Sequence, residues 1–224
     1  MAEKDKSSSV IYAEGQFAMP VGRLFFGNNI FEPGKPFKEG EEPKYSITIG
    51  YPPETEFVGY KKALAEILSH PALKGRCIKK GSDEEAKLLA AGYTATDITY
   101  QDEFIQQMQK PLKKEMDPDK LEKYPFMAGQ FIFKSSSKLP PPVVGPDRKL
   151  IRINEKDKLY NGVYVAAIVS LGYVIGSKIL FAQLNGVQYV RPGDPLSTQK
   201  VDLELFEFFE PEKTETVNLD DLGI

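Results

Sequence analysis

Residues 160–173 read YNGVYVAAIVSLGY and residues 178–190 read KILFAQLNGVQYV, with only the four residues VIGS between them. Both stretches are rich in β-branched and aromatic residues, which favour a pleated strand. Two such runs joined by a short link that contains glycine are typical of an antiparallel hairpin. The sequence therefore predicts a long β-hairpin here, and this is the densest β block of the chain.

Three segments before the hairpin also have β character. Residues 10–31 are apolar but are broken by glycines and a proline, which predicts a long, curved first strand. Residues 44–51 and 129–135 alternate between two faces, as half-buried strands do. Between these two strands, apolar residues spaced by three and four over residues 56–68 predict an amphipathic helix. We expect this helix to cover one face of the sheet.

The order of these elements predicts a mostly β (α+β) fold, namely an OB-fold five-stranded barrel with an insertion of short helices and loops at about residues 72–120. We expect a single domain over residues 10–205, a disordered N-terminus at residues 1–9 and an acidic, flexible C-terminal tail at residues 206–224. No window approaches the roughly 20 apolar residues of a membrane helix, and no secretion signal is recognisable. The sequence therefore predicts a soluble protein.

The net charge of −3 by itself argues against a polyanionic partner. The charge is unevenly spread, because the last 24 residues carry eight acids and one base, a net of −7, which leaves +4 on the first 200. A mildly basic body thus ends in an acidic tail. In many proteins such a tail only improves solubility. Beside a basic groove, it would compete with nucleic acid at high effective concentration and recruit partners once displaced.

Motifs of the common enzyme classes do not occur, since the chain has no G-x-x-x-x-G-K loop, no G-x-S-x-G elbow and no H-E-x-x-H. The only histidine, His70, precedes a proline at a helix end, where capping or solvent exposure is commoner than catalysis. The only cysteine, Cys77, has no partner for a disulfide and fits a reducing cytoplasm. We expect no catalytic residue, no cofactor and no metal site, although a carboxylate-only metal site stays open.

Aromatic and basic residues are interleaved between residues 131 and 173. Unpaired bases stack on exposed rings while cations follow the phosphates, so this layout indicates a surface for single-stranded nucleic acid. The rings fit a core equally well, and acids dilute the charge between residues 148 and 158. From this pattern the candidate DNA-binding residues are Phe131, Phe133, Lys134, Lys138, Arg148, Lys149, Tyr160, Tyr164 and Tyr173.

Residues 127–196 resemble a family of phage-encoded single-stranded-DNA-binding proteins that was first catalogued as a domain of unknown function. The resemblance lies in AGQFIFKSSSK, PPPVVGPDRKLI, LYNGVYVAAIVSLGY and ILFAQLNGVQYVRPGDPL, and EPKYSI at residues 42–47 matches the family's P-K-Y-S strand start. On the matching residues, the resemblance implies a DNA face formed by Lys44, Phe131, Phe133, Lys134, Lys138, Tyr160 and Tyr164.

The same resemblance implies an OB-fold protein without catalytic activity that coats single-stranded DNA, without sequence preference, during phage DNA replication, recombination or repair. It places the protein in the cytoplasm of the infected bacterial host. Replication proteins such as a polymerase or a helicase-primase are the implied partners of the tail, and a homo-oligomer stays open. The expected partner-binding residues of the tail are Asp220, Asp221, Leu222 and Ile224.

Two other functions remain open at this point, because a barrel fold does not define a function. The first is a structural or assembly protein of a virion, which would form a stable ring and have no affinity for single-stranded DNA. The second is a metal-dependent nuclease with a carboxylate site, which would degrade DNA when magnesium is present.

Overall fold

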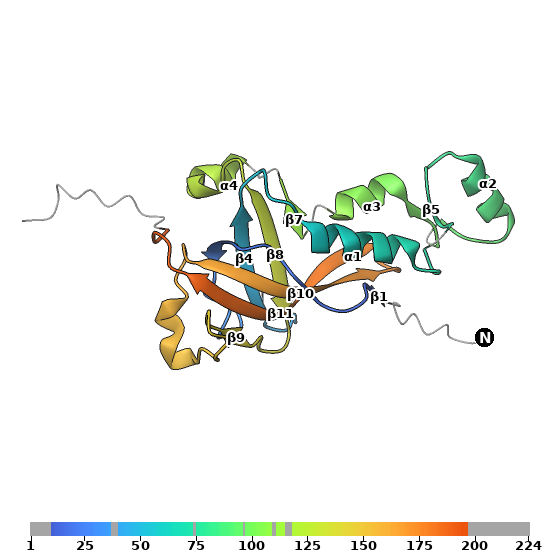
Figure 1. The fold of residues 1–224 in the computed structure, drawn as a ribbon. Helices are drawn as coiled ribbons and strands as arrows, with labels where there is room; N and C mark the ends of the chain where they lie inside the picture. The colour runs from blue at the N-terminus through green and yellow to red at the C-terminus, as the bar shows by residue number, and fades with distance from the viewer. Residues whose placement is uncertain are drawn as a thin grey trace, which may run out of the picture.

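The computed structural model of the chain describes residues 10–36, 40–73, 75–95, 97–108, 111–114 and 118–196. At its centre lies a long antiparallel hairpin of β10 (Tyr164–Val174) and β11 (Ile179–Arg191), which confirms the predicted hairpin (Figure 1). The register shifts at Tyr164/Val165 and at Ile168/Val169. Such bulges bend a strand and increase its twist, so β10 can curve around a barrel while it stays paired with β11.

The expected long first strand is instead three short ones: β1 (Val10–Tyr12), β2 (Phe17–Ala18) and β3 (Gly22–Phe26). All three pair antiparallel with the second edge of β10. The breaks fall near Gly15, whose φ is 72°, and Pro20, which has no N–H to give to a ladder. The prediction of one continuous strand was therefore wrong, while its β character was confirmed.

Five strands close a barrel: β3, β4 (Tyr45–Tyr51), β8 (Phe131–Ser137), β11 and β10, which pairs again with β3. Every neighbouring pair is antiparallel except β8 and β11, which run parallel and are joined by the single pair Gln183↔Ser136. Across this sparse seam, the Ser135 hydroxyl donates to the Ala182 carbonyl at 3.2 Å. A closed five-stranded barrel of this connectivity confirms the predicted OB-type fold.

The core fills the barrel and extends beneath α1 (Val58–Ser69). In β4 the side chains of Ile47, Ile49 and Tyr51 point inward and are fully buried, as their spacing of two predicts. The buried face of α1 consists of Tyr60, Ala63, Leu64 and Ile67, which belong to the same cluster. The predicted amphipathic helix is therefore confirmed.

Residues between α1 and β8 form two additions to the barrel. The first contains β5 (Cys77–Ile78), α2 (Asp83–Ala90), β6 (Thr99–Tyr100) and α3 (Gln101–Met108), and it projects from one end of the molecule (Figure 1). We call it the lobe. The second contains β7 (Leu112–Lys113), which pairs with β8, followed by α4 (Pro118–Lys123) and the 3-10 helix η1 (Pro125–Met127).

The lobe is attached to the far end of the hairpin. Thr99 and Tyr173 share a buried hydroxyl–hydroxyl hydrogen bond of 3.3 Å, and the Phe104 ring lies 5.4 Å from the Tyr173 ring. In the turn of the hairpin, Lys178 Nζ donates to Glu103 Oε2 at 2.9 Å. These contacts hold the end of the hairpin against the lobe.

The second addition encloses a separate small core of Phe25, Met127 and Ile132 on the outside of the barrel. On the opposite side, β9 (Val143–Val144) pairs parallel with β11 and is followed by the 3-10 helix η2 (Ile153–Lys158). Within the described ranges, none of the helices is long and apolar enough to span a membrane.

Two buried tyrosines differ in how their hydroxyls are satisfied, and this difference is testable. Tyr51 Oη has no hydrogen-bond partner among the described residues, and burial raises its pKa. Because Tyr51→Phe removes an unpaired hydroxyl, we expect the free energy of unfolding to stay unchanged or to rise by up to about 1 kcal/mol. Tyr173→Phe deprives buried Thr99 of its partner and should cost about 1–2 kcal/mol. Urea unfolding measures both, and a larger loss for Tyr51→Phe would contradict the assignment.

Candidate nucleic-acid interface

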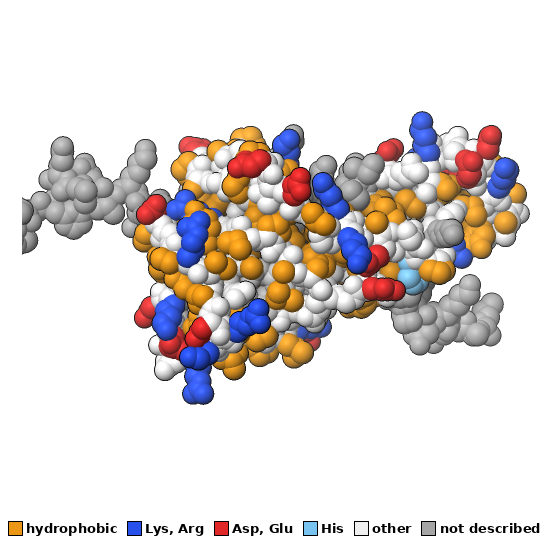
Figure 2. Space-filling view, viewed as in Figure 1, with side chains coloured by type: hydrophobic (Ala, Val, Ile, Leu, Met, Phe, Trp, Pro, Cys, Tyr) orange, Lys and Arg blue, Asp and Glu red, His pale blue; other side chains and the backbone are white. Residues whose placement is uncertain are grey.

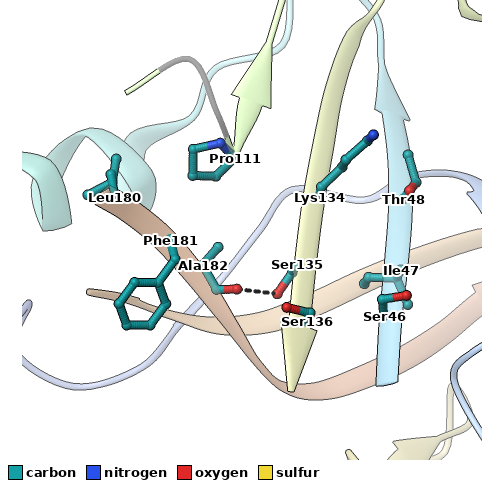
Figure 3. Close-up of a pocket in the computed structure, with 10 residues that line it drawn as sticks. All are labelled: Ser46, Ile47, Thr48, Pro111, Lys134, Ser135, Ser136, Leu180, Phe181 and Ala182. Carbon is teal, nitrogen blue, oxygen red and sulfur yellow. Dashed lines mark hydrogen bonds between the residues drawn. The ribbon is translucent and has the colours of Figure 1, made fainter. Parts of the chain in front are cut away.

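A groove runs over the outer surface of β4, β8 and β11. It consists of two adjoining hollows with volumes of about 430 and 450 Å³, which share Ser136 and Phe181. Figure 3 shows the first hollow, with Lys134 and Thr48 on one side and Phe181 on the other. The side chains that we use to define the groove are Tyr12, Lys44, Ser46, Thr48, Lys134, Ser136, Lys138, Phe181 and Gln183.

The alternation of β8 places two lysines in this groove. Phe133, Ser135 and Ser137 are buried, whereas Lys134 and the residue after the strand, Lys138, are exposed. Alternate residues of a strand point to the same face and are about 6.6 Å apart, so the two lysines are about 13 Å apart along the strand. Ser136 lies between them. The groove therefore has a cation at either end of a floor lined with hydroxyls.

Three lysines gather at the Lys134 end. Although the Lys134 side chain is exposed in part, partial burial lowers the pKa of its amine below the ordinary value, and the nearby charges of Lys120 and Lys113 lower it further. Within the described part of the chain, no salt bridge joins Lys134 to an acid. Mutual repulsion of three cations is unfavourable, and a bound anion would relieve it. This end of the groove therefore favours a polyanion.

At the other end, Lys138 Nζ lies 2.5 Å from Glu42 Oε2, and both side chains are exposed. The hydrogen bond from Lys138 and its charge lower the pKa of the Glu42 carboxyl, with a smaller contribution from the charge of Lys44. Exposed ion pairs contribute little net free energy. Another anion can therefore replace Glu42 beside Lys138 at small cost.

Two aromatic residues of the groove, Tyr12 and Phe181, were not among the sequence-based candidates. Their rings meet edge to face, with centroids 5.9 Å apart. Both belong to one row across the sheet, in which Gly172 of β10 pairs with Tyr12 on one side and with Phe181 on the other. A glycine inside a strand that is otherwise rich in large residues indicates space for a neighbouring ring, and this signal is present in the sequence.

The structure separates the sequence-based candidates into three groups. Lys44, Lys134 and Lys138 line the groove. Phe133 and Tyr173 do not, because both have no exposed surface and belong to the main core. This corrects the expectation that they lie on the DNA face. Side chains alternate along β8, so an outward Lys134 requires an inward Phe133.

The half-buried Phe131 also belongs to the core side, where its ring lies 5.3 Å from that of Phe57. Arg148 and Lys149 lie in the turn after β9, where Lys149 forms an exposed ion pair with Asp147 at 3.3 Å. The hollow beside them, of about 620 Å³, also contains Glu155 and shares no residue with the groove. In Figure 2, acidic and basic side chains are mixed in this part of the surface. The charged residues that line this hollow are two acids, Asp147 and Glu155, and two bases, Lys149 and Lys158, so their charges balance.

Tyr160 and Tyr164 belong to a structural element that we call the clasp, which consists of residues 160–164 and 191–196. The Tyr160 hydroxyl donates to the Gly193 carbonyl at 2.9 Å, and the Arg191 guanidinium lies 3.5 Å from the centroid of the Tyr164 ring. The Leu196 N–H donates to the Asn161 carbonyl at 2.8 Å. The two most recognisable motifs of the sequence, LYNGVY and RPGDPL, therefore pack against each other and are joined by hydrogen bonds.

The remaining expectations concern the tail, metals and the cysteine. Residues Asp220, Asp221, Leu222 and Ile224 lie outside the described residues. Among the residues that the structure describes, no three His, Cys, Asp or Glu side chains are grouped so that they would hold a metal ion. Burial raises the pKa of the Cys77 thiol, which disfavours the reactive thiolate.

Comparison with known proteins adds to this geometry. Residues 20–218 match the family described as Enterobacter phage Enc34, ssDNA-binding protein. The solved structure of the single-stranded DNA-binding protein from bacteriophage Enc34 is similar at 18% identity, with a TM-score of 0.52 over 85% of this chain and 88% of that one. Its C-terminal truncation gives 20% identity and a TM-score of 0.51 over 87% and 99%. No curated protein gives a significant sequence match.

The clasp predicts an unequal response to two glycine substitutions. A Cβ at Gly162, where φ is 121°, would lie 2.1 Å from the Asp194 carbonyl oxygen, whereas a Cβ at Gly92, where φ is 89°, would meet no atom within 4 Å. We expect Gly162→Ala to lower the free energy of unfolding by about 3 kcal/mol or more and Gly92→Ala by about 1 kcal/mol, the cost of a positive φ alone. Urea unfolding of both variants measures this, and equal losses would contradict the close packing of the clasp.

Proposed function

Because the chain belongs to the Enterobacter phage Enc34 ssDNA-binding protein family, we propose that it binds single-stranded DNA along the groove of β4, β8 and β11. The observation that carries this proposal is the row of outward side chains on β8, in which Lys134 and Lys138 flank Ser136. Lysines that neutralise phosphates bind any sequence equally. The protein then coats and protects single-stranded DNA without sequence preference and without a chemical step.

The groove lies where OB folds hold oligonucleotides, which is the face of the second and third barrel strands, here β4 and β8. Lys44 and Lys138 contact phosphates at one end and Lys134, with Lys113 and Lys120 nearby, does so at the other. The hydroxyls of Ser46, Thr48 and Ser136 line the floor between them. Small side chains there leave room for the strand.

We further propose that this binding serves DNA replication, recombination or repair of a phage in the cytoplasm of its bacterial host. The name of the family supports a phage setting. A protein that covers exposed single strands acts in all three processes, because each of them produces such strands. Replication proteins are then the partners with which it works, and the acidic tail is the segment that we propose they recognise, through Asp220, Asp221, Leu222 and Ile224.

Binding of fluorescently labelled oligo-dT, followed by anisotropy at several salt concentrations with an equal length of duplex as competitor, tests the proposal. For single strands, log K falls with log salt with a slope of about −0.7 per neutralised phosphate. Replacing Lys44, Lys134 and Lys138 together with Gln should weaken binding at low salt and reduce the magnitude of the slope by about 2.

The matched control replaces Arg148 and Lys149 with Gln on the mixed-charge surface. We expect little change in affinity or slope, because an acid already pairs with Lys149 there. If the control variant reduces the slope of log K against log salt as much as the groove variant does, the phosphates do not bind specifically in the groove and this part of the proposal is wrong. A wild-type protein that forms a stable ring but binds no oligo-dT at low salt would favour the virion-protein alternative.

The acidic tail gives a second prediction. A tethered segment with a net charge of −7 competes with DNA for the lysines of the groove at high effective concentration. Truncation after Glu204, which removes six of the eight acids and a net charge of −5, should therefore tighten oligo-dT binding several-fold at low salt, and less at high salt. Full-length protein with the six acids that follow Glu204 changed to Asn or Gln should behave like the truncated one. If both variants bind oligo-dT with the affinity of the wild type, the tail does not compete with DNA for the groove.

A further inference from the structure

Lysines alone do not decide how the bases of a bound strand are held. The lysines contact the phosphates, which leaves the bases of a bound strand to other side chains. Proteins that bind single strands hold such bases by stacking them on aromatic and apolar side chains.

The second hollow of the groove offers this surface. Tyr12 is 51% exposed and Leu139 is 74% exposed, so two apolar side chains face solvent beside Lys138. Phe181 forms the third apolar side of the same hollow of about 450 Å³. Apolar side chains that share one hollow, beside lysines, indicate a binding site more strongly than isolated exposed apolar residues do.

The row Tyr12–Gly172–Phe181 explains how the two rings are held. A Cβ at Gly172 would lie 2.4 Å from Cζ of Phe181, so the Phe181 ring lies over the glycine. Tyr12 approaches from the other side of Gly172, and the two rings are nearly perpendicular at 89°. Gly172 thus provides the space that brings rings from β1 and β11 together across β10.

We propose that Tyr12, Phe181 and Leu139 form a slot for one nucleobase of the bound single strand, while Lys44 and Lys138 hold the adjoining phosphates. This inference rests on the proposed function and adds to it the position at which a base leaves the stack. Gln183 lines the same hollow, and its amide offers both a donor and an acceptor to the edge of any base. Tyr12 precedes the segment, residues 20–218, that matches the family. The slot therefore depends on a residue outside the matched segment.

The chain contains no tryptophan, so a single introduced tryptophan makes a specific reporter. We would prepare Tyr12→Trp and, as a control in the lobe, Tyr93→Trp, whose ring position lies beside Arg76. Each is titrated with oligo-dT and with an abasic oligonucleotide of the same length. Stacking of a base should quench the fluorescence of the Tyr12→Trp variant with oligo-dT and much less with the abasic strand, and the Tyr93→Trp variant should respond to neither.

Affinity measurements complete the test. Tyr12→Ala should weaken oligo-dT binding about tenfold, the effect of one lost stack, and leave the salt slope and the affinity for the abasic strand unchanged. Tyr12→Phe should keep the affinity within about twofold, and Phe181→Leu should resemble Tyr12→Ala. Thermal unfolding of each variant shows whether it is folded.

The failure of the slot and the failure of the proposed function give different results. If wild type binds oligo-dT but Tyr12→Ala binds it equally well and the fluorescence of Tyr12→Trp is not quenched, the slot is wrong and DNA binding stands. If Tyr12→Ala weakens the abasic and dT strands equally, Tyr12 supports the backbone path and the slot is also wrong. If wild type binds no single strand, the proposed function fails first.

Discussion

The whole barrel depends on the pairing of β10, which is used on both edges. One edge holds β11 from Tyr164↔Arg191 to Val174↔Ile179, and the other holds β1, β2 and β3 in succession. A strand paired on both sides has neighbours for the N–H and C=O groups of both its edges. Because β10 also carries fully buried Val165, Ala167, Val169 and Leu171, it contributes to the core as well as to the ladder.

The groove follows from the weakest pairing of the barrel. Strands β8 and β11 meet at one residue pair and one side-chain hydrogen bond, so their outer surfaces diverge on either side of Gln183↔Ser136. The hollows of the groove lie along this seam, and the serines of β8 that line them have small side chains that leave space in the groove. A seam with more pairs would bring larger areas of the two strands together and leave less space for a ligand.

Much of this architecture was predictable from the sequence. The hairpin, β4, α1 and β8 all follow from apolar residues spaced by two or by three and four, and each was confirmed. The site was predicted less well. Lys44 could be named from the family resemblance, and Lys134 and Lys138 from the interleaving of aromatic and basic residues. For Phe133 and Tyr173 it was necessary to know which face of each strand points inward. Tyr12 and Phe181 meet only through the register of β1, β10 and β11, which the sequence does not reveal.

The clasp has a consequence for how such chains diverge from one another. The clasp contains its glycines, the Tyr160–Gly193 hydrogen bond and the Arg191–Tyr164 contact, and none of these involves a residue of the groove. They therefore stabilise the fold and do not contact a ligand in the groove. Chains that share LYNGVY and RPGDPL then share a frame, and they are free to change Lys44, Lys134, Lys138 and Tyr12 without losing it. A chain that keeps the clasp and lacks these four side chains would keep the barrel and lose the lysines and the exposed ring of the groove.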